Sequence, residues 1–178
     1  MPTMAEAKDD EPAWAHELYD FLMGEGVSIF CYVPDAGHKV LINRSLADPA
    51  AESIALTTEE EGVPLIAGAH LGGRKATLLM QSSGVGNCVN MLSLLSAGRF
   101  PFLSFVSMRG DFGEGNPWQM AMGKAVEPVL KAMDVMCLRA ETPADVIPCA
   151  RAAHDMAYKS NVATAVLLTQ RLIGAKAF

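Results

Sequence analysis

Three consecutive carboxylates lead directly into an uncharged segment. Residues 57–72 read TTEEEGVPLIAGAHLG, so Glu59, Glu60 and Glu61 precede a run of small and apolar residues. Successive side chains on a helix point about 100° apart, so one carboxyl group can turn inward while its neighbours face water. A buried carboxyl group can hold or transfer a proton, but acids at a helix start are also common because the helix dipole favours them. The residues alone leave both interpretations open.

A glycine-rich segment follows one of the apolar runs. Residues 81–87 read QSSGVGN, and Gly84 and Gly86 would let the backbone approach a ligand closely. Successive amides at the start of the following helix can bind an anion. The segment lacks the Gly-Lys-Ser/Thr of a P-loop and does not match G-x-G-x-x-G. It predicts a ligand-binding turn, with an ordinary strand-to-helix turn as the alternative.

Short apolar runs alternate with segments of helical spacing. The runs predict six strands, of which the second is the weakest: 28–33, 53–56, 76–80, 101–107, 135–138 and 164–168. One of the predicted helices starts at Pro143, behind the capping residue Thr142. Uninterrupted apolar strands separated by helices imply a sheet covered on both faces. The predicted fold is therefore α/β, in three α/β/α layers with a mainly parallel, about six-stranded sheet.

Three polar loops follow predicted strands, at residues 34–39, 81–87 and 108–116. In parallel sheets, ligands bind beyond the carboxyl ends of the strands. We therefore expect these loops to meet at the functional site.

Length, charge and cysteine usage limit the class of protein. The 178 residues suit one domain at 12–178 behind an acidic tail at 1–11, and the formal net charge is −6. That charge argues against nonspecific binding to nucleic acid or to an anionic membrane. The tail does not read as a signal peptide, and no apolar run approaches the roughly 18–20 residues that span a bilayer. The four cysteines are widely spaced, so we expect reduced thiols, no metal site in this chain and a cytoplasmic location.

The order of three motifs resembles a known enzyme family. VPDAGHKVLI, TEEEGVPLIAGAHLGGRKATLLMQSSGVGNCVNML and SMRGDFGEGNPWQMAMGKAVEPVL are similar to the pyrimidine-binding domain of thiamine diphosphate-dependent decarboxylases. The resemblance covers about residues 12–172. The most similar branches are sulfopyruvate decarboxylase alpha subunits and phosphonopyruvate decarboxylases.

The resemblance implies a role for one of the three acids. In this family a glutamate nine residues before a small-residue helix turn reaches the cofactor's aminopyrimidine ring, and the matching residue is Glu59, before Gly68. A carboxyl group there can give a proton to the ring nitrogen, which a glutamine could not do. Glu60 and Glu61 are then expected to face solvent.

The resemblance also implies roles in the first loop. Asp35 matches a residue placed for proton transfer near the reacting carbon, with a helix-capping aspartate as the equal alternative. His38 would bind or protonate substrate, or else would be a solvated histidine.

The other two loops carry further matching positions. The resemblance assigns cofactor contacts to Ser82, Ser83, Gly84 and Asn87 and a substrate contact to Asn90.

Two cations and an amide follow in the third motif. Arg109 and Lys124 could bind an anionic head group such as sulfonate or phosphonate, and Gln119 could line the same pocket. Surface charges are the alternative for both cations.

One expected part of such an enzyme is missing from the sequence. The family binds Mg²⁺ and the diphosphate through GDG followed by an asparagine pair, and this chain has neither. The resemblance therefore implies a beta subunit that carries the metal and diphosphate, with thiamine diphosphate shared between the chains in an α₂β₂ or larger assembly.

The expected function is that of the alpha subunit of a split 2-oxo acid decarboxylase, converting sulfopyruvate to sulfoacetaldehyde and CO₂. Phosphonopyruvate or another small 2-oxo acid is the alternative substrate. A noncatalytic structural or regulatory subunit on the same fold, and a flavodoxin-like nucleotide-binding domain, are the alternatives from other classes.

Overall fold

Six parallel strands form one sheet in the order β2-β1-β3-β4-β6-β5. The computed structural model describes residues 11–175. The strands are β1 Val27–Tyr32, β2 Glu52–Ala55, β3 Lys75–Gln81, β4 Phe102–Ser107, β5 Met136–Ala140 and β6 Ala163–Leu168. All six predicted strands are confirmed, and the predicted N-terminal tail lies outside the described residues except for Glu11.

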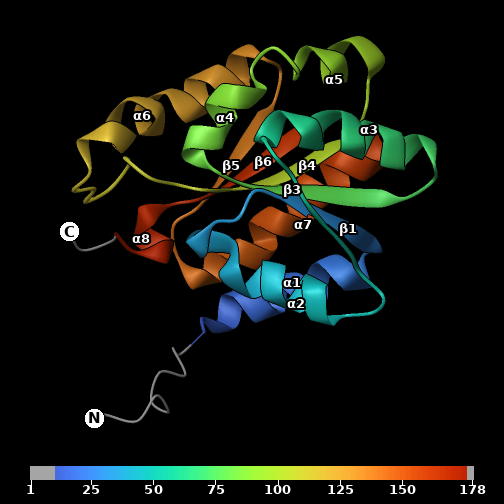
Figure 1. Cartoon of the computed structure of the whole chain (residues 1–178), viewed down its shortest axis with the longest axis horizontal. Coiled ribbons are helices and arrows are strands. Elements are labelled where there is room, and N and C mark those ends of the chain that lie inside the picture. Colours follow the sequence, from blue (N-terminus) through green and yellow to red (C-terminus); the bar gives the residue numbers. More distant parts are fainter. Residues whose placement is uncertain (1–10, 176–178) are drawn as a thin grey trace.

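Helices cover both faces of the sheet, which confirms the predicted three-layer α/β fold (Figure 1). One layer contains α1 Ala13–Gly24, α2 Lys39–Ala47 and α7 Pro143–Ser160. The other contains α3 Gly62–Leu71, α4 Ser82–Cys88, α5 Ser93–Gly98 and α6 Pro117–Ala132. A short helix, α8 Gln170–Ile173, follows β6, and single 3₁₀ turns precede α2 (η1 Ala36–His38) and α3 (η2 Glu59–Glu61).

Each face of the sheet packs its own apolar cluster. Phe30, Leu79 and Phe105 point into the cluster under α1 and α7, whereas Leu78 and Val106 point into the cluster under α3 and α6. The central strands β4 and β6 are buried along their whole length, but the edge strand β2 is only partly buried. This explains why the central runs read as uninterrupted apolar sequence and the second run reads weakly.

The glycine-rich segment, which was predicted as a loop, is helical. Helix α4 begins at Ser82, directly after β3, and neither Gly84 nor Gly86 has a positive φ. The segment therefore connects β3 directly to α4, and its role in binding a ligand stays a prediction.

The loop at 108–116 is fixed against α6 by two glycines. A Cβ atom on Gly123 would overlap the carbonyl oxygen of Arg109, and a Cβ atom on Gly110, whose φ is 75°, would overlap the carbonyl of Gln119. The loop and the helix therefore touch backbone to backbone.

Within residues 11–175, no helix combines the length and the apolar character needed to cross a bilayer.

We predict that Gly123→Ala destabilises the chain by about 1–3 kcal/mol, the usual cost of overpacking, because the new methyl group meets the backbone of the loop. Gly68→Ala is the matched control, since a Cβ atom there meets nothing within 4 Å. The control should gain about 0.5–1 kcal/mol from lower chain entropy in the unfolded state. Urea unfolding of both variants checks the difference, and equal stabilities would contradict the described contact.

Candidate active site

Glu59 is a buried acid at the start of η2, beyond the carboxyl end of β2. Its residue surface is 8% exposed, and the Asn87 side-chain amide donates a hydrogen bond to its Oε2 at 2.8 Å. Glu60 and Glu61 are exposed, and Glu61 accepts a hydrogen bond from the backbone N–H of Thr57. The expected division between one inward acid and two solvated neighbours is confirmed.

Gly84 provides the surface against which Glu59 lies. A Cβ atom at Gly84 would overlap the carboxyl carbon and Oε1 of Glu59. Because Gly84 has no side chain, the carboxyl group of Glu59 can approach the backbone of α4 closely. Helix α4 fixes Glu59 twice, through the bare backbone of Gly84 and through the amide of Asn87 one turn later.

Asp35 lies in a second polar cluster, at the carboxyl ends of β1, β3 and β4. Its Oδ2 accepts hydrogen bonds from the Gly37 N–H at 3.1 Å and from the Ser107 hydroxyl, and its Oδ1 accepts from the Gln81 amide at 3.2 Å. Gln81 in turn accepts a hydrogen bond from the Ser83 hydroxyl at 2.9 Å. Asp35 therefore caps η1, as the structural alternative proposed, and also joins a network that reaches α4.

Gln81 and Ser107 were not predicted as site residues. They are register partners at the last positions of the neighbouring parallel strands β3 and β4. Each ends an apolar run with a polar side chain, and this signal could have identified them.

Asp35 and Arg109 both line a cavity of about 120 Å³, which the end of α8 also lines. Its lining residues are Asp35, Ala36, Gly37, Ser107, Arg109, Ile173 and Gly174. The lining of this cavity thus contains both an acidic and a cationic residue.

Arg109 is a buried member of an ion pair, so the surface-charge alternative is wrong. The residue is 8% exposed, and its guanidinium donates to both carboxyl oxygens of Glu114, through Nε at 2.5 Å and a terminal nitrogen at 2.8 Å. Hydrogen bonding to Arg109, together with the Asn116 N–H and the Gln170 amide, lowers the pKa of Glu114 to about 2. The bidentate geometry fixes the plane of the guanidinium.

Gln170 joins α8 to the loop at 108–116, which the sequence did not indicate. Its side-chain oxygen accepts hydrogen bonds from the N–H groups of Asp111 and Phe112, and its amide donates to Glu114 at 2.9 Å. Gln170 is 2% exposed. A glutamine two residues beyond an apolar strand carries no pattern that would mark it as the partner of a distant loop.

Ser82 also holds this loop. Its hydroxyl accepts a hydrogen bond from the Arg109 N–H at 3.1 Å, and its residue surface is fully buried. Ser83 and Asn87 lie on the outer side of α4, where Asn87 is exposed, and Asn90 is exposed in the turn beyond. Ser82 is therefore a buried support of the loop, whereas Ser83 and Asn87 have accessible surface and also bond to Gln81 and Glu59.

His38 is not a solvated histidine. It is fully buried, and its Nε2 lies 3.1 Å from the carbonyl oxygen of Met80. Burial lowers the pKa of His38, because the charged imidazolium loses its hydration. Its ring lies inside the protein, beneath the cluster that contains Asp35.

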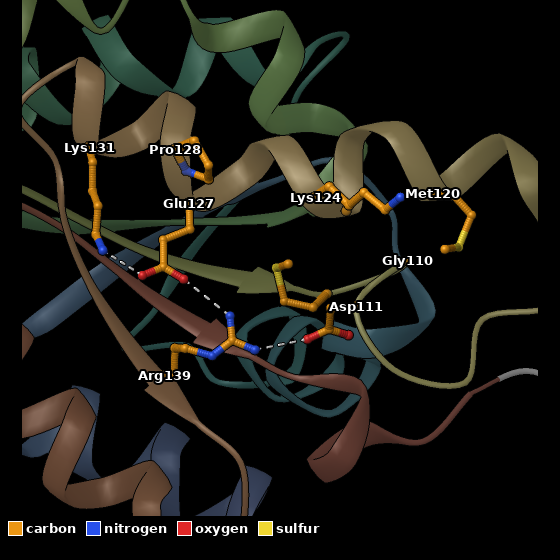
Figure 2. A pocket seen from close by; sticks show the side chains of 10 residues that line it. Gly110, Asp111, Met120, Lys124, Glu127, Pro128, Lys131 and Arg139 are labelled. Atoms are coloured by element: carbon orange, nitrogen blue, oxygen red, sulfur yellow. Dashed lines mark hydrogen bonds and ion pairs between the residues drawn. The ribbon is translucent and has the colours of Figure 1, made fainter.

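Lys124 lies in a different cleft from Asp35 and Glu59. The cleft measures about 530 Å³, lies between α6, the loop at 108–116 and the edge strand β5, and contains an ion-pair network centred on Arg139 (Figure 2). Arg139 lies 3.3 Å from carboxyl oxygens of Asp111 and Glu127. Gln119 is partly buried, and its side-chain oxygen has no hydrogen-bond partner among the described residues. Lys124 and Arg109 therefore line different cavities.

The Arg109–Glu114 pair should make stability depend on pH. The folded-state pKa of Glu114, about 2, is lower than the ordinary glutamate value of about 4.3, so the unfolded chain binds the proton first. We predict that the stability due to this pair is full above about pH 5 and declines as the pH falls towards 2. In Glu114→Gln this decline should be smaller and neutral-pH stability lower. Urea unfolding across this range measures both, and parallel pH profiles would contradict the assignment.

The chain shares sequence with known proteins over most of its length. It is 33% identical over 152 residues to "Sulfopyruvate decarboxylase subunit alpha" of Methanococcus maripaludis, covering 85% of this chain and 91% of that one. It is also 33% identical over 151 residues to the protein of that name in Methanocaldococcus jannaschii, covering 84% and 89%. "Phosphonopyruvate decarboxylase" of Streptomyces viridochromogenes is 37% identical over 123 residues, which are 68% of this chain but 31% of that protein.

A solved structure confirms the fold at low sequence identity. A 2-oxoglutarate:ferredoxin oxidoreductase from Magnetococcus marinus superposes with a TM-score of 0.73 and 15% identity, over 91% of this chain and 29% of that one. No protein-family model matches the chain. Because 33% identity extends over 91% of the Methanococcus maripaludis subunit, the chain belongs to the family of sulfopyruvate decarboxylase alpha subunits.

Proposed function

We propose that this chain is the alpha subunit of a split, thiamine diphosphate-dependent decarboxylase that converts sulfopyruvate to sulfoacetaldehyde and CO₂. The observation that carries the proposal is the buried carboxyl group of Glu59, held by Asn87 and accommodated by Gly84. Membership of the sulfopyruvate decarboxylase alpha subunit family supports the choice of reaction.

The residues around Glu59 fit the pyrimidine end of this cofactor. Burying a carboxyl group is costly unless it is hydrogen-bonded, and α4 supplies a donor and a close surface for it. Asn87 itself is exposed, so the site opens at the protein surface. When bound, thiamine diphosphate supplies a carbon nucleophile and an electron sink for decarboxylation. The task assigned to Glu59 is to hold and exchange a proton at its carboxyl oxygen, with Asn87 fixing the orientation.

We propose that Asp35 and Arg109 contact the substrate. Both line the cavity of about 120 Å³, where Ser107 and Gln81 fix the carboxyl group of Asp35. Asp35 would exchange protons near the reacting carbon, and Arg109 would face an anionic head group. Lys124 has less support for this role, because it lines a separate cleft.

The metal and diphosphate motif of the family, GDG followed by an asparagine pair, is missing from the sequence. Residues 11–175 contain no group of three or more histidine, cysteine, aspartate or glutamate side chains that could hold a metal ion. We assign Mg²⁺ and the diphosphate to a beta subunit, in an α₂β₂ or larger complex.

The four free cysteines agree with a reducing, cytoplasmic setting.

Two alternatives remain testable. Phosphonopyruvate is the second candidate substrate, since a phosphonopyruvate decarboxylase is 37% identical over 123 residues. Sulfonate and phosphonate differ in charge, so relative rates with the two substrates in the reconstituted complex discriminate between them. A purely structural or regulatory subunit would not need the arrangement of Gly84 and Asn87 around a buried acid.

We predict that the purified chain alone releases no CO₂ from sulfopyruvate, and that activity appears when it is co-expressed with a beta subunit in the presence of thiamine diphosphate and Mg²⁺. The reason is that the sequence lacks the GDG motif and the asparagine pair through which the family binds Mg²⁺ and the diphosphate. A coupled assay for sulfoacetaldehyde measures the reaction. Full activity of the single chain would refute the split-subunit proposal.

We predict that Glu59→Gln lowers the turnover of the reconstituted complex by about 10²–10⁴-fold, the usual contribution of a general acid or base. The amide can fill the same space but cannot transfer the proton. Glu60→Gln is the matched control, because it removes an exposed carboxyl group from the same turn and should keep wild-type turnover. Circular dichroism establishes that both variants fold. Equal rates for the two variants would remove Glu59 from its assigned role.

A further inference from the structure

The positive charge of Arg109 is balanced by two carboxyl groups of the same chain. Glu114 accepts the bidentate contact from the guanidinium. The hydrogen bond to Glu114 raises the pKa of Arg109, and the charge of Asp35 acts in the same direction. With both carboxyl groups ionised, the three side chains together carry one negative charge in excess.

Glu114 is fixed in this position and is shielded from water. Its side chain is 1% exposed. Besides the contact with Arg109, its carboxyl oxygens accept hydrogen bonds from the Asn116 N–H and from the Gln170 amide, each at 2.9 Å. Salt screens a buried charge much less than an exposed one. The negative charge of Glu114 therefore acts on any ion that comes close to Arg109.

The cavity beside Arg109 has the size of a small head group. Its volume of about 120 Å³ corresponds to roughly four water molecules, each of which occupies about 30 Å³ in the liquid. A tetrahedral group with one central atom and three oxygens is of this size. Among the described residues that line the cavity, only Asp35 and Arg109 are charged. A head group in the cavity therefore meets one cation whose charge Glu114 and Asp35 already offset.

This charge balance distinguishes a sulfonate from a phosphonate. A sulfonate carries one negative charge, whereas a phosphonate, like a phosphate ester, carries up to two at neutral pH. The Coulomb energy of a head group in a given field is proportional to its charge. Near the three side chains, two carboxylates repel the second charge of a phosphonate and one guanidinium attracts it. The cavity therefore favours the head group of lower charge.

We propose that Glu114 is a positioning residue that sets the specificity of this cavity: by neutralising Arg109, it favours a singly charged sulfonate over a doubly charged phosphonate. Glu114 acts through Arg109. The inference rests on the proposed function, which brings the substrate head group to Arg109. Relatives of both names match this chain, so the preference is a property of the site rather than of the overall similarity.

The test compares kcat/KM for sulfopyruvate and for phosphonopyruvate in the complex reconstituted with the beta subunit. The wild-type complex should favour sulfopyruvate, and Glu114→Gln should lower the ratio of the two values by about 10-fold, because one negative charge is lost beside the head group. A merely structural defect would reduce both values together and leave their ratio unchanged. Glu127→Gln is the matched control, since Glu127 is also paired with cations but lines the separate cleft around Arg139 (Figure 2), and it should keep the wild-type ratio.

A second variant tests the same charge balance without breaking the buried ion pair. Ala36 is exposed and lines the cavity, so Ala36→Lys adds a cation there and should also shift the ratio towards phosphonopyruvate. Ala47→Lys, at an exposed position of α2 outside the cavity lining, is its control and should keep the wild-type ratio.

A binding measurement is independent of turnover. Isothermal titration calorimetry of the complex with 3-sulfopropanoate and 3-phosphonopropanoate, which lack the reactive carbonyl group, gives the ratio of the two Kd values. This ratio should change in the same direction and by a similar factor in Glu114→Gln and in Ala36→Lys.

The outcomes separate the specificity inference from the proposed function. Unchanged ratios in Glu114→Gln and Ala36→Lys, or a wild-type preference for the phosphonate compounds, overturn the role of Glu114 even if sulfopyruvate is decarboxylated. If the Kd ratios shift as expected but the wild-type complex decarboxylates neither substrate, the role of Glu114 stands and the proposed function fails. Absence of both turnover and binding overturns both.

Discussion

A buried carboxyl group next to a bare helical backbone is the contact on which the proposed chemistry depends. Glu59 can be buried only because Asn87 donates to it and because Gly84 leaves room for it. These residues come from two different crossover connections, and the sheet brings them together because all its strands run parallel. Parallel pairing places the carboxyl ends of β1, β2, β3 and β4 at one edge, so the acids and amides that follow those strands become neighbours.

The loop at 108–116 is held by a buried ion pair. Arg109 and Glu114 lie in one loop, and the cost of burying their charges is offset by a bidentate contact and by the amide of Gln170. Breaking this network would leave an uncompensated charge, so it gives the loop at 108–116 a single arrangement. Arg109 lines the small cavity that Asp35 also lines.

The two faces of the sheet are covered by helices that differ in charge. The layer of α1, α2 and α7 has charged helices, and its core holds Phe30 and Phe105. The layer of α3 to α6 supplies the supports of Glu59, and its helices α3, α4 and α5 contain no Asp, Glu, Lys or Arg. The two layers therefore differ in the charge that their helices carry.

The sequence alone determined the six strands and the α/β class, because these follow from apolar periodicity along the chain. The choice of Glu59 as the inward acid came from the family resemblance, since the residues alone left it open. The sequence also indicated Asp35 and the close approach at Gly84. Only the tertiary structure decided that His38 is buried, that Arg109 is paired, that Lys124 lies in another cleft and that Gln170 holds a distant loop. The physical reason is that burial and pairing depend on which segments the sheet order brings together, and β4 pairs with β6, which begins more than fifty residues later along the chain.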